Sequence, residues 1–189
     1  MNIAIDIDDT LTESFDYFQP FVAEYFGAEP EEVRRRNISY GNLPAEWKSR
    51  GLDFYRAYYD RVVPDTPFKS DAAWGVRELR NMGHRIVIIT GRSTAFYTDP
   101  YKTTEEELKK GGIVYDQLIC TLDKGRACRE EAIDVLVDDL PSNCDAAVKE
   151  GTSAILFTSK ANRDTETVYP RASDWKTVIE QIRAMDKTK

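Results

Sequence analysis

The chain opens on an apolar stretch that leads directly into acidic residues. Apolar residues from Ile3 to Ile5 precede Asp6, in the pattern of a β-strand that enters a protein core. Asp8 and Asp9 follow within three positions. Because alternate residues of a strand share a face, Asp6 and Asp8 start on the same side, where their negative charges repel. The pattern therefore predicts a strand whose acidic end needs a cation.

From residue 70 onward the chain alternates between helical and strand patterns. Predicted helices span 71–82, 103–110, 124–131, 142–150 and 174–185, and predicted strands span 85–90, 117–120, 134–137 and 153–157. The strand at 85–90 is almost wholly aliphatic, as expected for a strand buried on both faces. Strands that alternate with helices form a parallel sheet covered on both sides. We therefore expect an α/β fold with a Rossmann-like, three-layer parallel sheet core.

Residues 14–69 interrupt this alternation. They contain three helical patterns, which run from Phe15 to Phe26, from Pro30 onward and from Leu52 to Val62, and they contain no strand pattern. We expect residues 14–69 to form a small helical cap inserted after the first strand, and residues 1–13 and 70–189 to form the α/β core.

Composition fits a folded domain and excludes several classes of function. Of 189 residues, 41% are hydrophobic and 31% are charged, and the formal net charge is −7. This acidic balance argues against binding to duplex nucleic acid, which needs a basic surface, but it leaves small phosphorylated substrates open. The longest aliphatic run, Ile86 to Ile89, is far too short to cross a membrane, and the N-terminus lacks the pattern of a signal peptide. We expect a cytoplasmic protein with no membrane partner.

Histidine and cysteine content narrows the chemistry further. His84 is the only histidine and lies in a predicted loop, so neither a histidine-based catalytic triad nor a His-rich zinc site is expected. Cys120, Cys128 and Cys144 are odd in number and form no Cys-x-x-Cys pattern, which predicts free thiols in a reducing cytosol. The sequence does not give the oligomeric state, and a homodimer is one option.

Polar residues gather where three predicted strands end. The groups are Asp6, Asp8 and Thr10, then Thr90, Gly91 and Arg92, and finally Asp138 and Asp139. Ligands of open α/β sheets bind beyond the carboxyl ends of the strands, so we expect the three groups to meet at one site. Mg²⁺ is the cation expected there, because it is a hard ion that takes a few protein oxygens together with substrate phosphate.

The order of these groups resembles the haloacid dehalogenase superfamily of aspartate-nucleophile phosphohydrolases. In this sequence the motifs are Asp6-Ile7-Asp8-Asp9-Thr10, then Thr90, Lys124 and Asp138-Asp139. The insertion lies where that superfamily places a helical cap. The stretch Ile155-Leu156-Phe157, followed by Asn162-Arg163 and Trp175, looks like the cytosolic type C 5′(3′)-deoxyribonucleotidase family. Thr90-Gly91-Arg92, in contrast, is similar to the corresponding motif of polynucleotide phosphatases.

The resemblance implies a role for each motif residue. Asp6 would attack phosphorus and form an aspartyl-phosphate, while Asp8 would protonate the leaving alkoxide and later accept a proton from water. Mg²⁺ would be held by Asp6, the Asp8 carbonyl and Asp139. Lys124 and the Thr90 hydroxyl would stabilise negative charge on the phosphoryl group. Thr10 and the Gly91 amide would contact substrate. Asp138 would hold either a metal-bound water or Lys124.

The cap is expected to recognise the leaving group, since the core motifs bind only the phosphoryl group. Phe15, Tyr40 and Trp47 could form a flat apolar wall for a nucleobase. Arg92 either contacts substrate or forms a salt bridge, and the sequence does not decide between these.

The expected function is a Mg²⁺-dependent phosphomonoesterase for a small phosphorylated metabolite, with a 5′-nucleotidase acting on nucleoside monophosphates as the first candidate. A phosphatase for a sugar phosphate or a polynucleotide end is the alternative. A phosphoacceptor signalling module without turnover is the alternative of another class.

Overall fold

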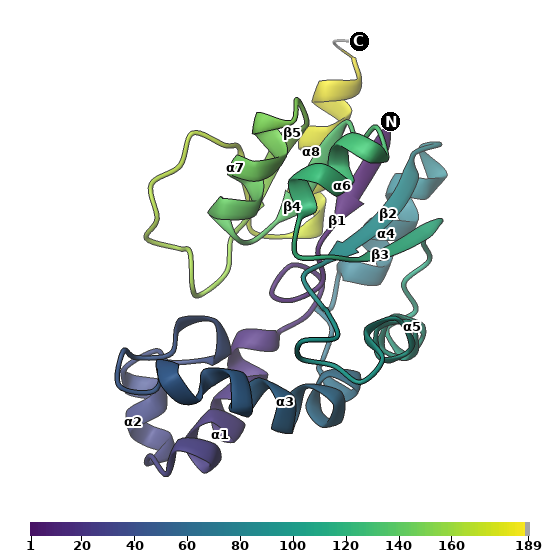
Figure 1. Ribbon diagram of the computed structural model, residues 1–189. Helices are drawn as coiled ribbons and strands as arrows, with labels where there is room; N and C mark the ends of the chain where they lie inside the picture. Colours follow the sequence, from purple (N-terminus) through teal and green to yellow (C-terminus); the bar gives the residue numbers. More distant parts are fainter. Residues whose placement is uncertain (188–189) are drawn as a thin grey trace.

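The first strand of the chain lies in the middle of the sheet. The computed structural model describes residues 1–187 and shows strands β1 (Asn2–Ile5), β2 (Arg85–Thr90), β3 (Gln117–Cys120), β4 (Val135–Asp138), β5 (Ser153–Phe157) and β6 (Arg171–Ala172). Their order is β3-β2-β1-β4-β5-β6, and each neighbouring pair is parallel (Figure 1). The predicted α/β fold with a parallel sheet is confirmed.

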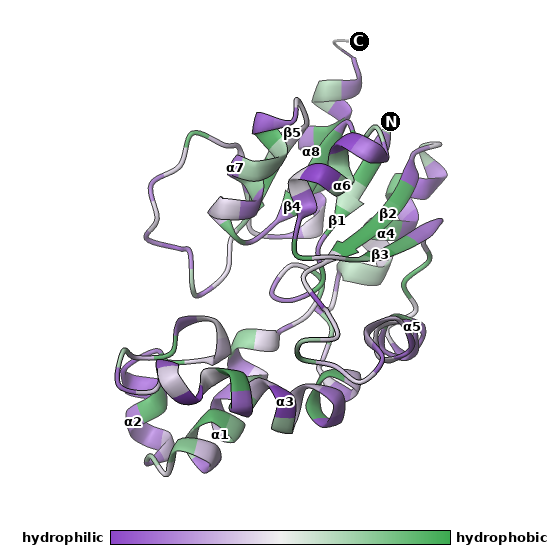
Figure 2. Ribbon diagram, in the orientation of Figure 1, coloured by the Kyte–Doolittle hydropathy of each residue, from purple (hydrophilic) through white to green (hydrophobic). Residues whose placement is uncertain are grey.

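Helices cover both faces of the sheet. They are α4 (Ala72–Asn81), α5 (Pro100–Lys110), α6 (Lys124–Glu130), α7 (Pro141–Lys149) and α8 (Trp175–Asp186). Alternate side chains of β1 point to opposite faces, so Ile3 and Ile5 pack with α4 and α8, whereas Ala4 packs with α6 and α7. The hydrophobic strands at the centre of the three layers are visible in Figure 2. Both faces of the sheet are therefore core, which explains the continuous aliphatic run of β2.

One close contact fixes how α4 lies on α8. A Cβ atom on Gly75 would lie 2.5 Å from the Cβ of Trp175, so the two helices can approach this closely only because residue 75 is glycine. Trp175 is fully buried at the start of α8, and its backbone N–H donates to the Asp71 carboxylate at 2.8 Å.

The cap, residues 14–69, contains the helices predicted for it. These are α1 (Ser14–Phe26), α2 (Pro30–Arg35) and α3 (Gly51–Val62), with 3-10 turns at Tyr40–Asn42, Lys48–Arg50 and Val63–Asp65. Gly27 ends α1 in the left-handed conformation at φ 67°, as its place after the helical pattern predicted. The cap has its own aromatic-rich cluster, which Phe96 and Tyr97 of the β2–α5 connection also join. The exact boundaries of the cap stay a prediction.

Two adjacent chain segments join the cap to the core. Thr12 forms an antiparallel bridge with Phe68, and the flanking residues extend it: the Glu13 N–H donates to the Pro67 carbonyl, and the Lys69 N–H donates to the Leu11 carbonyl, both at 2.8 Å. In Figure 1, α1, α2 and α3 lie at one end of the molecule and both termini at the other.

Two details of the sequence-based assignment were wrong. Helix α5 begins at Pro100, three residues before the predicted start, because Asp99 caps it by accepting from the Lys102 N–H at 3.0 Å. Strand β6 lies inside a stretch predicted to be loop. It has only two residues, Arg171 and Ala172, and this is too short to show a period.

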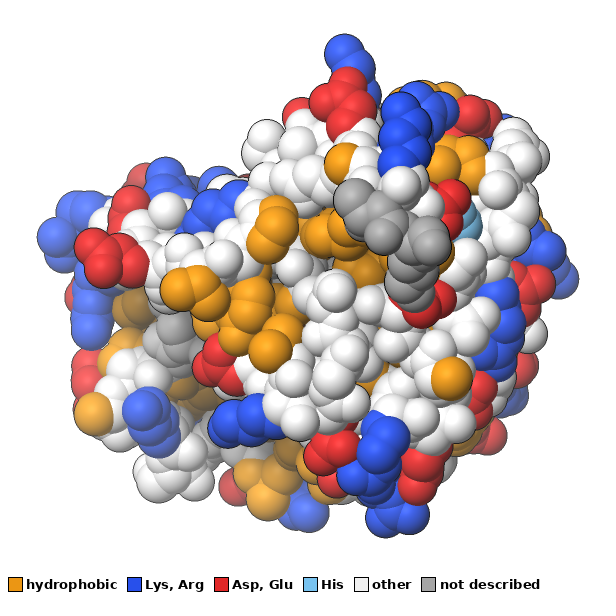
Figure 3. Space-filling view, turned by 90° about the horizontal axis from the view of Figure 1, so that it is seen from above, with side chains coloured by type: hydrophobic (Ala, Val, Ile, Leu, Met, Phe, Trp, Pro, Cys, Tyr) orange, Lys and Arg blue, Asp and Glu red, His pale blue; other side chains and the backbone are white. Residues whose placement is uncertain are grey.

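The remaining sequence-level observations concern single residues and the surface. The three cysteines are free thiols. His84 is buried, and its Nδ1 lies 3.2 Å from the N-terminal amine, which is a structural setting. No helix within residues 1–187 is long and apolar enough to span a membrane. Acidic and basic side chains are mixed on the face that Figure 3 shows, which is the molecule of Figure 1 seen from above.

Candidate active site

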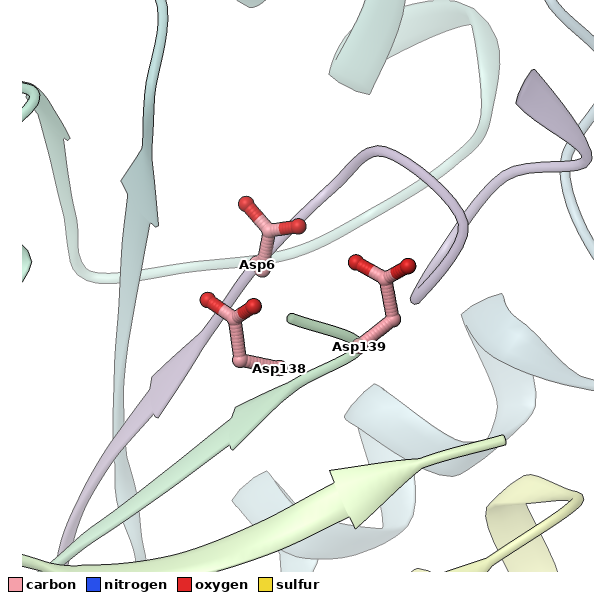
Figure 4. A group of neighbouring side chains, drawn as sticks. All are labelled: Asp6, Asp138 and Asp139. Carbon is pink, nitrogen blue, oxygen red and sulfur yellow. The ribbon is translucent and has the colours of Figure 1, made fainter. Parts of the chain in front are cut away.

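Two neighbouring strands bring three carboxylates together. Asp6 follows β1 and Asp138 ends β4, and the Asp6 N–H donates to the Val137 carbonyl at 3.0 Å. Oxygen atoms of Asp6, Asp138 and Asp139 lie within 4.8 Å of one another, and all three residues are buried (Figure 4). The parallel register of β1 and β4 therefore builds the acidic cluster that the sequence placed at the strand ends.

Lys124 neutralises part of this cluster. It begins α6, whose N-cap is Asp123, and its Nζ lies 2.5 Å from Asp6 Oδ1 and 2.6 Å from Asp138 Oδ2. Burial acts to lower the pKa of Lys124, but the Asp138 and Asp6 carboxylates outweigh it and raise that pKa well above its ordinary value. The lysine is therefore a fixed cation between two carboxylates.

The cluster still carries excess negative charge. Burial, reinforced by Asp138 and Asp8, raises the pKa of Asp6 to about 7 despite the neighbouring Lys124. Burial and the nearby Asp9, Asp138 and Asp6 raise the pKa of Asp139 well above its ordinary value. A cation is the usual remedy for carboxylates held this close.

The donor set fits a divalent ion. Asp138 is already satisfied, because Lys124, the Leu140 N–H and the Asn143 side-chain amide all donate to it. The Asp139 carboxylate, in contrast, accepts no hydrogen bond from any residue within 1–187 and lies beside Asp6. Asp6 and Asp139 therefore offer free oxygens of the kind that Mg²⁺ binds.

A tight turn after β1 presents the next two carboxylates. The Ile7 carbonyl accepts from the N–H groups of Thr10, Leu11 and Thr12 at 2.8–3.2 Å. The turn requires a left-handed residue at Asp9, with φ 61°, a conformation that aspartate tolerates better than most side chains.

Each carboxylate of the turn has defined partners. Asp8 Oδ1 accepts from the Ser14 hydroxyl at 3.0 Å and from Arg92 at 3.2 Å, and Asp8 Oδ2 has only a longer contact of 3.4 Å with Arg92 Nε. Asp9 accepts from the Phe15 N–H at 2.7 Å and from the Tyr40 hydroxyl at 2.9 Å. Asp8 thus keeps one lightly held oxygen, whereas Asp9 connects the core to the cap.

A pocket of about 330 Å³ lies above these groups, between the core and the cap. Its charged lining comprises Asp6, Asp8, Asp9, Arg92, Lys124 and Asp139. Its aromatic lining comprises Phe15, Tyr40, Tyr55, Tyr59, Phe96 and Tyr97, and Gly41, Gly91, Leu122, Leu140, Asn143 and Ala161 complete the wall. The volume lies within the range of small-molecule sites, and the chemistry combines a charged floor with apolar rings.

Most residues predicted for the site line this pocket. They are Asp6, Asp8, Phe15, Tyr40, Gly91, Arg92, Lys124 and Asp139. Thr10 and Thr90 lie just outside the lining, fully buried, and neither hydroxyl has a hydrogen-bond partner within residues 1–187. Asp138 does not line the pocket, and its Oδ2 accepts from Lys124 at 2.6 Å. Arg92 forms salt bridges with Asp8 and Glu107 at the pocket wall, and its contact with substrate stays a prediction.

The prediction that Trp47 belongs to the pocket wall was wrong. Its ring stacks on Phe26 with centroids 4.6 Å apart and an interplanar angle of 5°, and it does not line the pocket. The sequence placed Trp47 in a loop, but the ring partner depends on how that loop folds back on α1.

Several pocket residues were not predicted. Phe96 and Tyr97 follow Arg92 closely, and two aromatic residues in an otherwise polar loop are the signal that could have revealed them. Tyr55 and Tyr59 are one helical turn apart on α3, a spacing that could not be distinguished from that of core residues. Ala161 comes from the β5–β6 loop, and no sequence signal marks it.

Comparison with known proteins establishes the fold. Neither a protein-family model nor a curated protein matches the sequence. Among solved structures, a haloacid dehalogenase-like hydrolase from Streptococcus pneumoniae is 15% identical, with 96% of this chain and 97% of that chain covered and a TM-score of 0.67. A HAD family hydrolase from Deinococcus radiodurans R1, solved with phosphate and sodium, is 11% identical, with 97% and 95% covered and a TM-score of 0.68.

A third similar structure is a D,D-heptose 1,7-bisphosphate phosphatase from B. bronchiseptica complexed with magnesium and phosphate. It is 13% identical, with 98% of this chain and 99% of that chain covered and a TM-score of 0.55. All three identities are low, while the covered lengths are almost complete. The chain therefore has the fold of the haloacid dehalogenase-like hydrolases.

Proposed function

We propose that this protein is a phosphomonoesterase that uses Asp6 as its nucleophile and acts on nucleoside monophosphates. The observation that carries the proposal is the state of the Asp6 carboxylate. Lys124 binds its Oδ1, while Oδ2 makes no hydrogen bond within residues 1–187 and belongs to a residue that lines the pocket. One oxygen is thus fixed and the other is available to attack phosphorus.

The first half of the reaction follows from this arrangement. Asp6 Oδ2 forms a bond to phosphorus as the bond between phosphorus and the ester oxygen breaks, which leaves an aspartyl-phosphate. Asp8 donates its proton to the departing alkoxide, and its lightly held Oδ2 is the oxygen free to do so. Lys124 stabilises the negative charge that collects on the phosphoryl oxygens.

The second half of the reaction returns Asp6 and Asp8 to their starting states. Asp8 accepts a proton from a water molecule, which attacks phosphorus, and the bond between phosphorus and Asp6 breaks to release inorganic phosphate. Asp6, Asp139 and the Asp8 carbonyl would hold Mg²⁺. When bound, this ion neutralises charge on the phosphate so that two anions can approach.

The other motif residues support binding rather than bond breaking. The Thr90 hydroxyl is buried without a partner at the end of β2, next to Gly91 of the pocket wall, and is available to donate to a phosphoryl oxygen. The phosphate bound to the D. radiodurans protein, and the magnesium and phosphate bound to the B. bronchiseptica phosphatase, support a phosphate site on this fold.

The leaving group is assigned from the aromatic wall. Six rings line the pocket: Phe15, Tyr40, Tyr55, Tyr59, Phe96 and Tyr97. Stacking of a base on such rings contributes about 1–3 kcal/mol of binding free energy, and a simple sugar phosphate has no base to stack. The wall therefore favours a nucleotide over a sugar phosphate. The side-chain donors of Arg92 are engaged by Asp8, Thr104 and Glu107, so Arg92 adds no support to the alternative of a polynucleotide end.

The test is phosphate release from a panel of phosphomonoesters, with and without Mg²⁺. The panel contains nucleoside monophosphates, sugar phosphates, glycerol phosphate and p-nitrophenyl phosphate, and wild type is compared with Asp6→Asn. Nucleoside monophosphates should rank first with wild type, and Asp6→Asn should be inactive while folded. Asp53→Asn, an exposed change in the cap, is the control.

The outcomes separate the two parts of the proposal. A sugar phosphate at the top of the panel would disprove the nucleotidase assignment and leave the phosphatase assignment standing. Substantial turnover by Asp6→Asn would disprove the nucleophile. Transient phosphorylation without turnover would favour a phosphoacceptor module instead.

A further inference from the structure

A second set of buried charges lies on the opposite side of Asp8 from the nucleophile. Glu107 on α5 is completely buried, and its Oε2 accepts from Arg92 Nη1, as does the Thr104 hydroxyl oxygen at 3.3 Å. Arg92 itself is 1% exposed. The other edge of the same guanidinium, formed by Nε and Nη2, faces the two oxygens of Asp8.

This arrangement is poorly explained by stability alone. A buried ion pair must recover the cost of removing both charges from water, and apolar residues of the same volume serve a core at least as well. Here three charged groups, Glu107, Arg92 and Asp8, meet in a row, and the second Glu107 oxygen, Oε1, has no partner within residues 1–187. The row ends at the Asp8 carboxylate, which lines the pocket, and this points to a role for the whole row in the chemistry of the pocket.

The geometry of guanidinium explains how such a role would work. The group is flat and rigid, so fixing Nη1 also fixes Nε and Nη2. Glu107 and Thr104 are one turn apart on α5 and hold Nη1 together, and the centroid of the Tyr97 ring lies 5.8 Å from the guanidinium carbon. With one edge held in this way, the opposite edge can hold Asp8 in only one orientation.

We propose that Glu107 is a positioning residue for catalysis: by holding Arg92, it orients the Asp8 carboxylate toward the ester oxygen of the substrate. Glu107 does not line the pocket and touches no substrate. The inference rests on the proposed function, because it requires Asp8 to deliver a proton to the leaving group. It adds to that function a residue from α5, an element that contributes no residue to the pocket wall.

The proposal predicts a dependence on the leaving group. An alkoxide, such as the leaving oxygen of a nucleotide, needs a well-placed proton donor. p-Nitrophenolate leaves readily as an anion and needs little help. Misorienting Asp8 should therefore slow hydrolysis of a nucleoside monophosphate much more than hydrolysis of p-nitrophenyl phosphate, whereas general damage to the fold would slow both alike.

The experiment measures kcat and KM of Glu107→Gln for both substrates with Mg²⁺ present. Glutamine keeps the shape of glutamate and removes only the charge that holds Arg92. We expect kcat for the nucleoside monophosphate to fall by roughly 100-fold with KM nearly unchanged, and kcat for p-nitrophenyl phosphate to fall by less than about 3-fold. Glu106→Gln, the exposed neighbour on α5, is the matched control and should match wild type on both substrates.

A second variant keeps the test decisive if Glu107→Gln does not fold. Thr104→Val removes the other acceptor of Arg92 Nη1 and should give the same selective loss, about 10-fold in kcat. Equal losses on both substrates, or a loss confined to KM, would overturn the inference while the proposed function stands. If wild type hydrolyses neither substrate, the proposed function fails first and the inference fails with it.

Discussion

The hydroxyl group of Tyr40, in the cap, donates a 2.9 Å hydrogen bond to Oδ2 of Asp9, in the core. The other oxygen of Asp9 accepts from the Phe15 N–H, at the start of the cap. Both Tyr40 and Phe15 line the pocket. The single buried carboxylate of Asp9 thus holds one side of the aromatic wall against the turn that follows β1.

Removing this contact should loosen the cap. Tyr40→Phe deletes only the hydroxyl and leaves a buried Asp9 oxygen without a donor. A hydrogen bond to a charged group contributes about 1.5–3 kcal/mol, which corresponds to a fall of roughly 3–12 °C in Tm for a chain of this length. Thermal unfolding measures the change. Tyr58→Phe is the control, because its hydroxyl donates to Glu24 away from the pocket, in a partly exposed setting, and Tm should change less. Equal shifts for the two variants would contradict the assignment.

The acidic cluster should make metal-free protein less stable as pH rises. The folded-state pKa of Asp6, about 7, lies above its ordinary value of 3.8, and that of Asp139 is also raised. Between pH 4 and pH 7 the folded protein therefore binds more protons than the unfolded chain, so stability falls with rising pH. The raised pKa of Glu107, about 7, acts in the same direction, whereas the lowered pKa of His84 acts in the opposite direction.

This pH dependence should shrink when a cation is present. We expect Tm in EDTA to be lower at pH 8 than at pH 5, and Mg²⁺ to raise Tm at pH 8 because it binds the folded state only. Asp139→Asn removes one of the crowded charges and one ligand, so its Tm should vary less with pH and respond less to Mg²⁺. A Tm that rises steadily from pH 5 to pH 8 in EDTA would contradict the charge balance described here.

Two aromatic residues should affect specificity differently. Phe96 lines the pocket, so Phe96→Ala should lower kcat/KM for a nucleoside monophosphate by roughly 5- to 150-fold, the equivalent of about 1–3 kcal/mol of stacking. p-Nitrophenyl phosphate should lose far less. Trp47→Ala should instead lower Tm and affect both substrates alike, because its ring stacks on Phe26. Selective loss with Trp47→Ala and not with Phe96→Ala would reverse this assignment.

Two lysines allow a buried and an exposed ion pair to be compared. Lys124→Met leaves Asp6 and Asp138 facing each other with no cation between them, which should cost about 3–5 kcal/mol of unfolding free energy at pH 8 and abolish turnover. Lys160→Met removes an exposed pair with Asp16, on α1, and should cost about 0–1 kcal/mol. Denaturant unfolding measures both. Similar costs for the two variants would show that Lys124 is not the neutralising cation.

The strand-end residues of the site could be predicted from the sequence. Asp6, Thr90 and Asp138 each end an aliphatic run, and adjacent parallel strands place such ends at one edge of the sheet. Lys124 could also be predicted from the sequence, since it starts the helix that leads into β4. These predictions needed only local patterns and the direction of the chain.

Other parts of the site depend on tertiary packing that no local pattern records. Glu107 stands in a run of three glutamates, and only the rotation of α5 against the core decides that it is buried while Glu105 and Glu106 are exposed. The same holds for Trp47, whose partner depends on how the cap folds. Strand β6 escaped prediction because two residues cannot show a period.

The central place of β1 in the sheet has a consequence for how the chain folds during synthesis. β1 is the first strand of this sequence, yet its two neighbours, β2 and β4, begin only at residues 85 and 135. The β2 edge of this apolar strand must therefore stay unpaired until the cap has been made, and its β4 edge until much of the core has been made. Such long-range pairing is slow and exposes the chain to aggregation.

The proposed nucleophile shares this delay. Asp6 and Lys124 are 118 positions apart, so no early fragment of the chain can hold the carboxylate beside its lysine. The proposed catalytic centre comes into being only when β4, the later neighbour of β1, is in place, and the onset of turnover would report that step.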